Sequence, residues 1–152
     1  MNVPTGTDRL GRYELLRPIA TGGMGTVWLA RLTGPEGIHR HLAVKILDPG
    51  ASADASDDAA ARVAMFLHEA RVIASLNHPH VTHVYDVGVA DDGRYYLAME
   101  YVHGVSLREV LDAAHQAGVE LPLAFGLSVV IAAAAGLHHA HERRGPAGPL
   151  GI

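Results

Sequence analysis

Three closely spaced glycines mark the segment Ile19-Ala20-Thr21-Gly22-Gly23-Met24-Gly25-Thr26-Val27, which joins two short apolar runs. The runs Tyr13–Ile19 and Thr26–Arg31 have the composition of strands, and the glycines between them predict a tight turn. A turn without side chains lets backbone N–H groups come close to a phosphate chain. The segment therefore fits a nucleotide-holding hairpin, although an ordinary hairpin turn has the same pattern.

Two other phosphate-binding patterns do not fit this segment. A dinucleotide fingerprint needs its glycines to open a helix, whereas Val27-Trp28-Leu29-Ala30 continues as a strand. A Walker loop needs a lysine followed by serine or threonine after its last glycine, and this chain has none there.

Lys45 lies in the run His41–Leu47, which we expect to be a strand covered on both faces. An ammonium among apolar neighbours is costly unless an anion meets it, although a lysine at a strand edge can also extend to solvent. Glu69 lies at the border of the apolar stripe of a predicted helix, Ala59–Leu76, and needs a partner for the same reason. We therefore predict that Lys45 and Glu69 pair.

Further strands and helices follow from turn and cap signals. Residues 48–58 predict a linker, and Val81–Val89 and Arg94–Tyr101 predict strands joined by an Asp-Gly hairpin. The capping box that begins at Ser106 predicts a helix to about Ala117, and a long apolar helix follows over 123–142. After it, the glycines and prolines of 145–149 predict irregular structure.

Composition excludes several classes of protein. The chain has 152 residues, of which 49% are apolar, and a formal net charge of −4, which gives no reason to expect nucleic acid or an anionic membrane as partner. Cysteine is absent, so disulfides and cysteine-based zinc sites are excluded. Since Met1–Asp8 lacks the apolar core of a signal peptide, we expect a cytoplasmic protein.

The uncharged segment Leu121–Ala140 is long enough to span a membrane. Its glycines and alanines lower its hydrophobicity, and we interpret it as a helix that packs in a protein core. The eleven histidines do not form a recognisable ligand spacing, so we expect no metal site from His80, His83, His138, His139 or His141.

From Arg12 to Ile152 the chain resembles the bacterial Ser/Thr protein kinases, which are members of the eukaryotic-like protein kinase family. The resemblance is carried by the glycine segment, by Ala43-Val44-Lys45, by Phe66-Leu67-His68-Glu69-Ala70, by Leu76-Asn77-His78-Pro79-His80-Val81 and by Tyr96-Leu97-Ala98-Met99-Glu100-Tyr101-Val102-His103-Gly104. One departure is Ala20, which stands where the family usually has the first glycine of the loop.

The resemblance implies an α+β fold of the protein-kinase type. Residues 12–101 would form the N-lobe, a five-stranded antiparallel sheet plus one regulatory helix, after a disordered tail over 1–11. Residues 102–152 would form the hinge and the first two helices of a helical C-lobe, truncated before the catalytic loop. The core face of the helix 123–142 would ordinarily pack against the missing part of that lobe, so in this chain we expect the helix to be exposed and to promote self-association.

The resemblance also implies an ATP site. Lys45 and Glu69 would be the catalytic pair, with the ammonium oriented toward the α and β phosphates. An apolar roof over adenine, a gatekeeper at Met99, two backbone contacts to the adenine edge and a ribose contact at Ser106 would complete the site. Its members would be Ile19, Ala20, Thr21, Gly22, Gly23, Met24, Gly25, Val27, Ala43, Lys45, Met99, Glu100, Val102 and Ser106.

The sequence contains no His-Arg-Asp and no Asp-Phe-Gly segment. The base aspartate and the Mg²⁺ ligands would lie beyond Ile152, so we expect this chain to be inactive alone and to use Mg²⁺ only with the missing lobe. The expected function is the ATP-binding portion of a kinase acting on Ser/Thr of protein substrates. Two alternatives stay open: a non-catalytic nucleotide-binding or kinase-interacting module, and an unrelated small α/β interaction domain.

Overall fold

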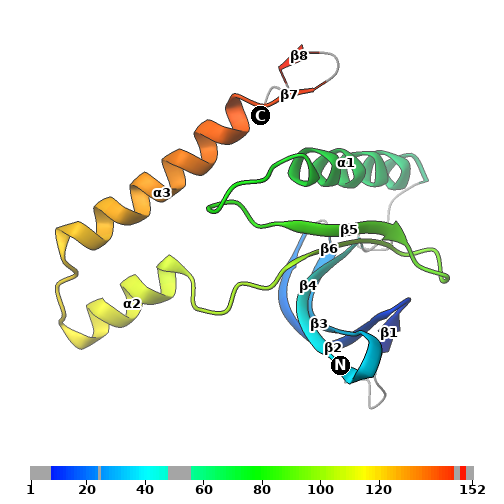
Figure 1. Ribbon diagram of the computed structural model, residues 1–152, viewed down its shortest axis with the longest axis horizontal. Coiled ribbons are helices and arrows are strands. Elements are labelled where there is room, and N and C mark those ends of the chain that lie inside the picture. The colour runs from blue at the N-terminus through cyan, green and yellow to red at the C-terminus, as the bar shows by residue number, and fades with distance from the viewer. Residues whose placement is uncertain (1–7, 24, 48–55, 146–147, 150–152) are drawn as a thin grey trace. The chain divides into compact units, whose positions relative to one another are not determined.

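The computed structural model describes residues 8–23, 25–47, 56–145 and 148–149. The chain forms two compact units, one from Met1–Ser75 with His83–Tyr101 and the other from Leu76–Thr82 with Val102–Ile152. The first unit is a curled antiparallel sheet with one long helix, and the second is mainly helical (Figure 1).

Six strands form the sheet of the first unit, in the order β1-β2-β3-β4-β6-β5, and every neighbouring pair is antiparallel. Their bounds are β1 Asp8–Leu10, β2 Tyr13–Gly22, β3 Gly25–Thr33, β4 His39–Leu47, β5 Val84–Val89 and β6 Tyr95–Glu100. The α+β class and the antiparallel sheet are confirmed, but the prediction of five strands is wrong.

The missed strand is β1. The sequence predicted a disordered tail over 1–11, and this is wrong for Asp8–Leu10, which pair with Tyr13–Leu15. Leu10 is fully buried, so a single apolar side chain in the core holds a segment too short to show a strand pattern. Residues 1–7 lie outside the described part of the chain.

Two irregularities bend β2. The register with β3 shifts between Leu15 and Arg17 and again between Pro18 and Ala20. Proline has no N–H to donate, so it fits in a strand at a bulge, and a bulge increases the local bend and twist. The pairing then continues to Gly22 opposite Gly25, so the strands extend into the predicted glycine turn.

The helix α1, Ser56–Ala74, lies along β5 (Figure 1). Its buried residues Phe66 and Ala70 form one apolar cluster with Leu47 and Leu97. A second cluster packs within the sheet and contains Leu10, Tyr13, Leu15, Ala30, Leu42, Val44, Ile46 and Ala98. Because β4 contributes to both clusters, the prediction of a strand covered on both faces is confirmed.

Two hairpin connections shape the rest of this unit. A short 3-10 helix, η1 Pro35–Gly37, joins β3 to β4. The predicted Asp-Gly hairpin joins β5 to β6, with Gly93 at φ 84° and its N–H 2.9 Å from the Ala90 carbonyl oxygen. β5 begins three residues later than predicted, because the Val81 N–H closes a turn onto the His78 carbonyl oxygen at 3.0 Å.

The second unit contains α2, Leu107–Ala117, and α3, Leu123–His141. The predicted capping box at Ser106 and Glu109 is confirmed, and Gly118 ends α2 in the left-handed region at φ 63°. Beyond α3, Arg144–Gly145 and Gly148–Pro149 pair as the short strands β7 and β8, so the prediction of irregular structure is wrong for residues 145, 148 and 149, and residues 146–147 lie outside the described part of the chain.

Most of α3 is exposed. Its buried residues are Gly136 and Ala140, and a Cβ on Gly136 would lie 3.1 Å from the His80 carbonyl oxygen, so the helix approaches the segment Leu76–Thr82 closely. Of the helices in the described ranges, α3 alone is long and apolar enough to cross a membrane by length and composition, with a mean hydropathy of 1.7. That criterion is weak, because core helices of soluble proteins also meet it.

Candidate nucleotide site

The ammonium of Lys45 meets the carboxylate of Glu69. Lys45 Nζ lies 2.9 Å from both Oε1 and Oε2 of Glu69, and its side chain is 18% exposed. The alternation of β4 explains the direction, because Lys45 shares the strand face of Leu47, which packs against α1. Glu69 follows Phe66 by three residues on α1, so both belong to the helix face toward the sheet.

A cavity of about 400 Å³ lies at the glycine hairpin and includes Lys45 in its wall. Its lining residues are Ala20, Thr21, Gly22, Gly23, Gly25, Val27 and Lys45. A Cβ on Gly22 or Gly23 would meet nothing within 4 Å, so the protein's own packing does not require glycine there. The missing side chains leave open space in which a ligand can approach the backbone.

The structure places other predicted site residues outside the wall of this cavity. Ile19 lies at the second bulge of β2 and is 37% exposed. Ala43 and Met99 are paired across β4 and β6, and Met99 packs against the Phe66 cluster. The Glu100 N–H donates to the His83 carbonyl oxygen at 2.8 Å, so a contact from Glu100 to an adenine would come from its carbonyl oxygen.

Three predicted site residues stand apart from this description. Val102 and Ser106 belong to the second unit. The Ser106 hydroxyl accepts from the Glu109 N–H at 3.3 Å and bonds the Glu109 carboxylate at 2.8 Å, so its hydroxyl caps α2. Met24 lies outside the described residues.

No group of three or more His, Cys, Asp or Glu side chains in the described ranges could hold a metal ion. His78 instead stacks on His139, with ring centroids 5.2 Å apart, and meets His80 edge-on at 5.3 Å. Desolvation, and after it the charges of His139 and His80, lower the pKa of His78. These histidines bind the segment Leu76–Thr82 to α3.

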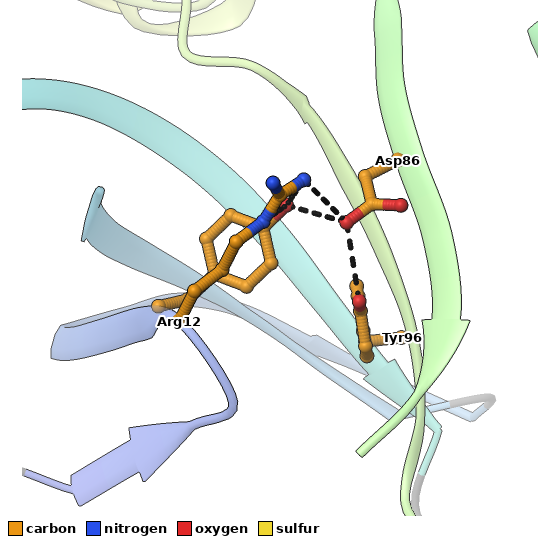
Figure 2. A network of polar contacts seen from close by, with 4 residues as sticks. Arg12, Asp86 and Tyr96 are labelled. Atoms are coloured by element: carbon orange, nitrogen blue, oxygen red, sulfur yellow. Dashed lines mark hydrogen bonds and ion pairs between the residues drawn. The ribbon is translucent and has the colours of Figure 1, made fainter. Parts of the chain in front are cut away.

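A second polar centre was missed by the sequence reasoning. Asp86 on β5 accepts hydrogen bonds from Arg12, Tyr13 and Tyr96 (Figure 2). On β5 the apolar residues Tyr85, Val87 and Val89 are exposed, whereas Asp86 lies on the less exposed face, so the apolar alternation of the sequence would have placed Asp86 outward. Nothing in the sequence points to donors 73 residues away.

Comparisons with known proteins identify the family of this chain. A family model described as protein tyrosine and serine/threonine kinase matches residues 13–145, and the chain belongs to that family. This family uses ATP and Mg²⁺.

Individual relatives are bacterial kinases. The tyrosine-protein kinase MasK of Myxococcus xanthus is 38% identical over 143 residues, which are 93% of this chain and 21% of MasK. The serine/threonine-protein kinase PrkC of Bacillus subtilis is 40% identical over 103 residues, covering 68% of this chain and 14% of PrkC. The PknI kinase domain of Mycobacterium tuberculosis superposes with a TM-score of 0.65 at 32% identity, over 93% of this chain and 52% of that domain. The chain therefore spans about half of a solved kinase domain.

Proposed function

We propose that this chain binds ATP and serves in a protein kinase that transfers the γ-phosphate to serine or threonine hydroxyls of proteins. The observation that carries the proposal is the contact of Lys45 with both carboxylate oxygens of Glu69, in the wall of a cavity formed by the glycine hairpin. The choice of Ser/Thr rests on the resemblance to PrkC. MasK is named as a tyrosine-protein kinase, so the resemblance to MasK favours a tyrosine hydroxyl as the phosphate acceptor.

Each part of the site has a physical role in this proposal. Backbone N–H groups of the hairpin approach the phosphates where Gly22 and Gly23 leave room. Lys45 neutralises charge on the α and β phosphates, and Glu69 keeps the ammonium oriented before the nucleotide arrives. The remaining members in the first unit act on the base: Ile19, Val27 and Ala43 cover adenine, Met99 limits its pocket, and Glu100 offers its carbonyl oxygen.

Mg²⁺ and the base that accepts the hydroxyl proton are not assigned to the described residues. None of their carboxylates and histidines group into a metal site, so we assign the ion to none of the residues that the structure describes. What these residues can do is bind the phosphates, orient them and exclude water from them.

Covalent labelling can test the site directly, because Lys45 is the sole lysine of the sequence. An adenine nucleotide analogue with an amine-reactive group should modify Lys45, and excess ATP should prevent this. Peptide mass spectrometry locates the label, and Lys45→Arg serves as the control that keeps the positive charge. Labelling that spares Lys45, or that ATP leaves unchanged, contradicts the proposal.

The exposed apolar surface of α3 supports a second role in self-association. Ile131 is 67% exposed, and Leu123, Leu127, Val130 and Leu137 are also exposed. Contiguous apolar surface of this kind favours association in water. We expect sedimentation velocity to show dimers or larger species for the wild type and monomers for Ile131→Asp. Ile38→Asp, at a position 70% exposed in the first unit, is the matched control and should not change the wild-type distribution. A wild-type chain that stays monomeric at all concentrations contradicts this role.

A further inference from the structure

Side chains join the two ends of the sheet. β1 and β5 stand at opposite ends of the strand order, yet Arg12, in the turn between β1 and β2, and Tyr13, the first residue of β2, both reach Asp86 on β5. The Arg12 guanidinium and the Tyr13 and Tyr96 hydroxyls donate to the same oxygen, Asp86 Oδ2, at 2.8, 2.7 and 3.1 Å (Figure 2). We call Arg12, Tyr13, Asp86 and Tyr96 the clasp.

Additional contacts hold the same two edges together. The Tyr13 and Tyr96 rings meet edge to face with centroids 5.5 Å apart. Asp8 on β1 lies 3.9 Å from Arg94, which directly precedes β6. A Cβ on Gly88 would lie 2.7 Å from the Tyr96 hydroxyl, so only glycine at this position lets the ring lie against β5 and reach Asp86.

The charges of the clasp persist across the neutral range. Burial raises the pKa of Asp86, but the hydrogen bonds from Tyr13, Tyr96 and Arg12 outweigh it and hold that pKa below its ordinary value of 3.8. Burial and the hydrogen bond to Asp86 raise the pKa of Tyr13 from 10.0 to about 12. The stability from Asp86 is therefore lost only as pH falls below the ordinary carboxyl range, and that from Tyr13 only as pH rises from 10.0 toward 12.

Strand pairing connects the clasp to both parts of the nucleotide site, the glycine hairpin and Lys45. Tyr13 is the partner of Leu32 at one end of the β2–β3 hairpin, and Gly22 opposite Gly25 forms the other end. Tyr96 is the partner of Ile46, the residue after Lys45. The Asp86 carboxylate therefore connects the open end of the β2–β3 hairpin, at Tyr13, to β4, the strand that carries Lys45.

We propose that Asp86 is a positioning residue, which fixes the curl of the sheet and thereby the height of the glycine hairpin above Lys45. The effect on nucleotide affinity rests on the proposed function, whereas the effect on the hairpin does not. β3 transmits the constraint, since its pairing with β4 runs without a register shift from Gly25 to Thr33. A clasp that only stabilised the fold would leave the hairpin ordered as long as the chain is folded.

Amide hydrogen exchange on the full chain can separate these roles. In Asp86→Asn we expect exchange at residues 25–27 to become about tenfold faster, the factor for one charge-assisted hydrogen bond, and to exceed any change at Val44. Val44 is fully buried in β4 and reports global unfolding. Asp91→Asn makes the same substitution at an exposed position in the same hairpin and should leave both rates unchanged.

A second measurement concerns nucleotide affinity. A non-hydrolysable ATP analogue should bind Asp86→Asn about tenfold more weakly than the wild type, and Asp91→Asn should bind like the wild type. Failure of the wild type to bind the analogue would defeat the proposed function, and the exchange data would still decide the role of the clasp.

Tyr96→Phe removes one hydroxyl from the clasp and gives a milder test if Asp86→Asn does not fold. It should accelerate exchange at residues 25–27 more than at Val44. Equal acceleration at both places, or none at residues 25–27, overturns the proposal for either variant.

Discussion

Lys45→Met is expected to weaken binding of an ATP analogue by about 10-fold to 150-fold, the equivalent of about 1.5–3 kcal/mol for a hydrogen bond to a charged group. Methionine keeps most of the length of the side chain but has no charge for the phosphates. The pair with Glu69 is also lost, so its carboxylate, 34% exposed, stands unneutralised at the cavity. Titration of the analogue with Trp28 fluorescence measures the change, because Trp28 is the sole tryptophan and pairs with Val44.

Arg71→Met is the matched control for this substitution. Arg71 is an exposed cation on α1, two residues after Glu69, so the variant removes one positive charge close to Glu69 in the sequence. Its affinity should equal that of the wild type. Equal losses in both variants would mean that the analogue responds to overall charge, and an unchanged affinity in Lys45→Met would remove Lys45 from the site.

Phe66→Ala is expected to lower the free energy of unfolding by about 3–5 kcal/mol, the usual cost of truncating a buried aromatic side chain. Phe66 is 1% exposed and packs with Leu47, Ala70 and Leu97, where α1 meets the sheet. Its removal leaves a cavity between α1 and β4 that these neighbours fill only in part. Urea denaturation followed by circular dichroism measures the change.

Met65→Ala tests whether burial is the cause. Met65 precedes Phe66 on the same helix but is 51% exposed, so its truncation should change the free energy of unfolding by less than about 0.5 kcal/mol. Alanine has the highest helix propensity, so neither loss can come from weaker helix formation, and similar losses for both variants would show that burial is not the cause.

The two expected effects are linked through α1. Phe66 anchors the helix to the sheet, and Glu69, three residues further along, meets Lys45 at 2.9 Å. A loosened helix lets the carboxylate leave the ammonium. We therefore interpret the packing of Phe66 as the condition for the geometry of the Lys45–Glu69 pair.

Much of the first unit could be predicted because its signals are local. Alternating apolar residues identify β4, and the three glycines identify the β2–β3 hairpin. The pairing of Lys45 with Glu69 was also expected, since two charges on faces that become buried have few other ways to be neutralised. The strand β1 was missed because three residues are too few to show a period.

The sequence by itself determined the strand and helix types, the glycine hairpin and the buried charge on β4, because these depend on neighbours within a few residues. Only the tertiary structure decided how the edges of the sheet meet. The Tyr13 hydroxyl finds Asp86 across 73 residues, and this contact depends on the bulges of β2, on the hairpin at Gly93 and on the absence of a side chain at Gly88 together. The periodicity of the sequence cannot predict this contact, because the two residues come together only when the sheet has curled.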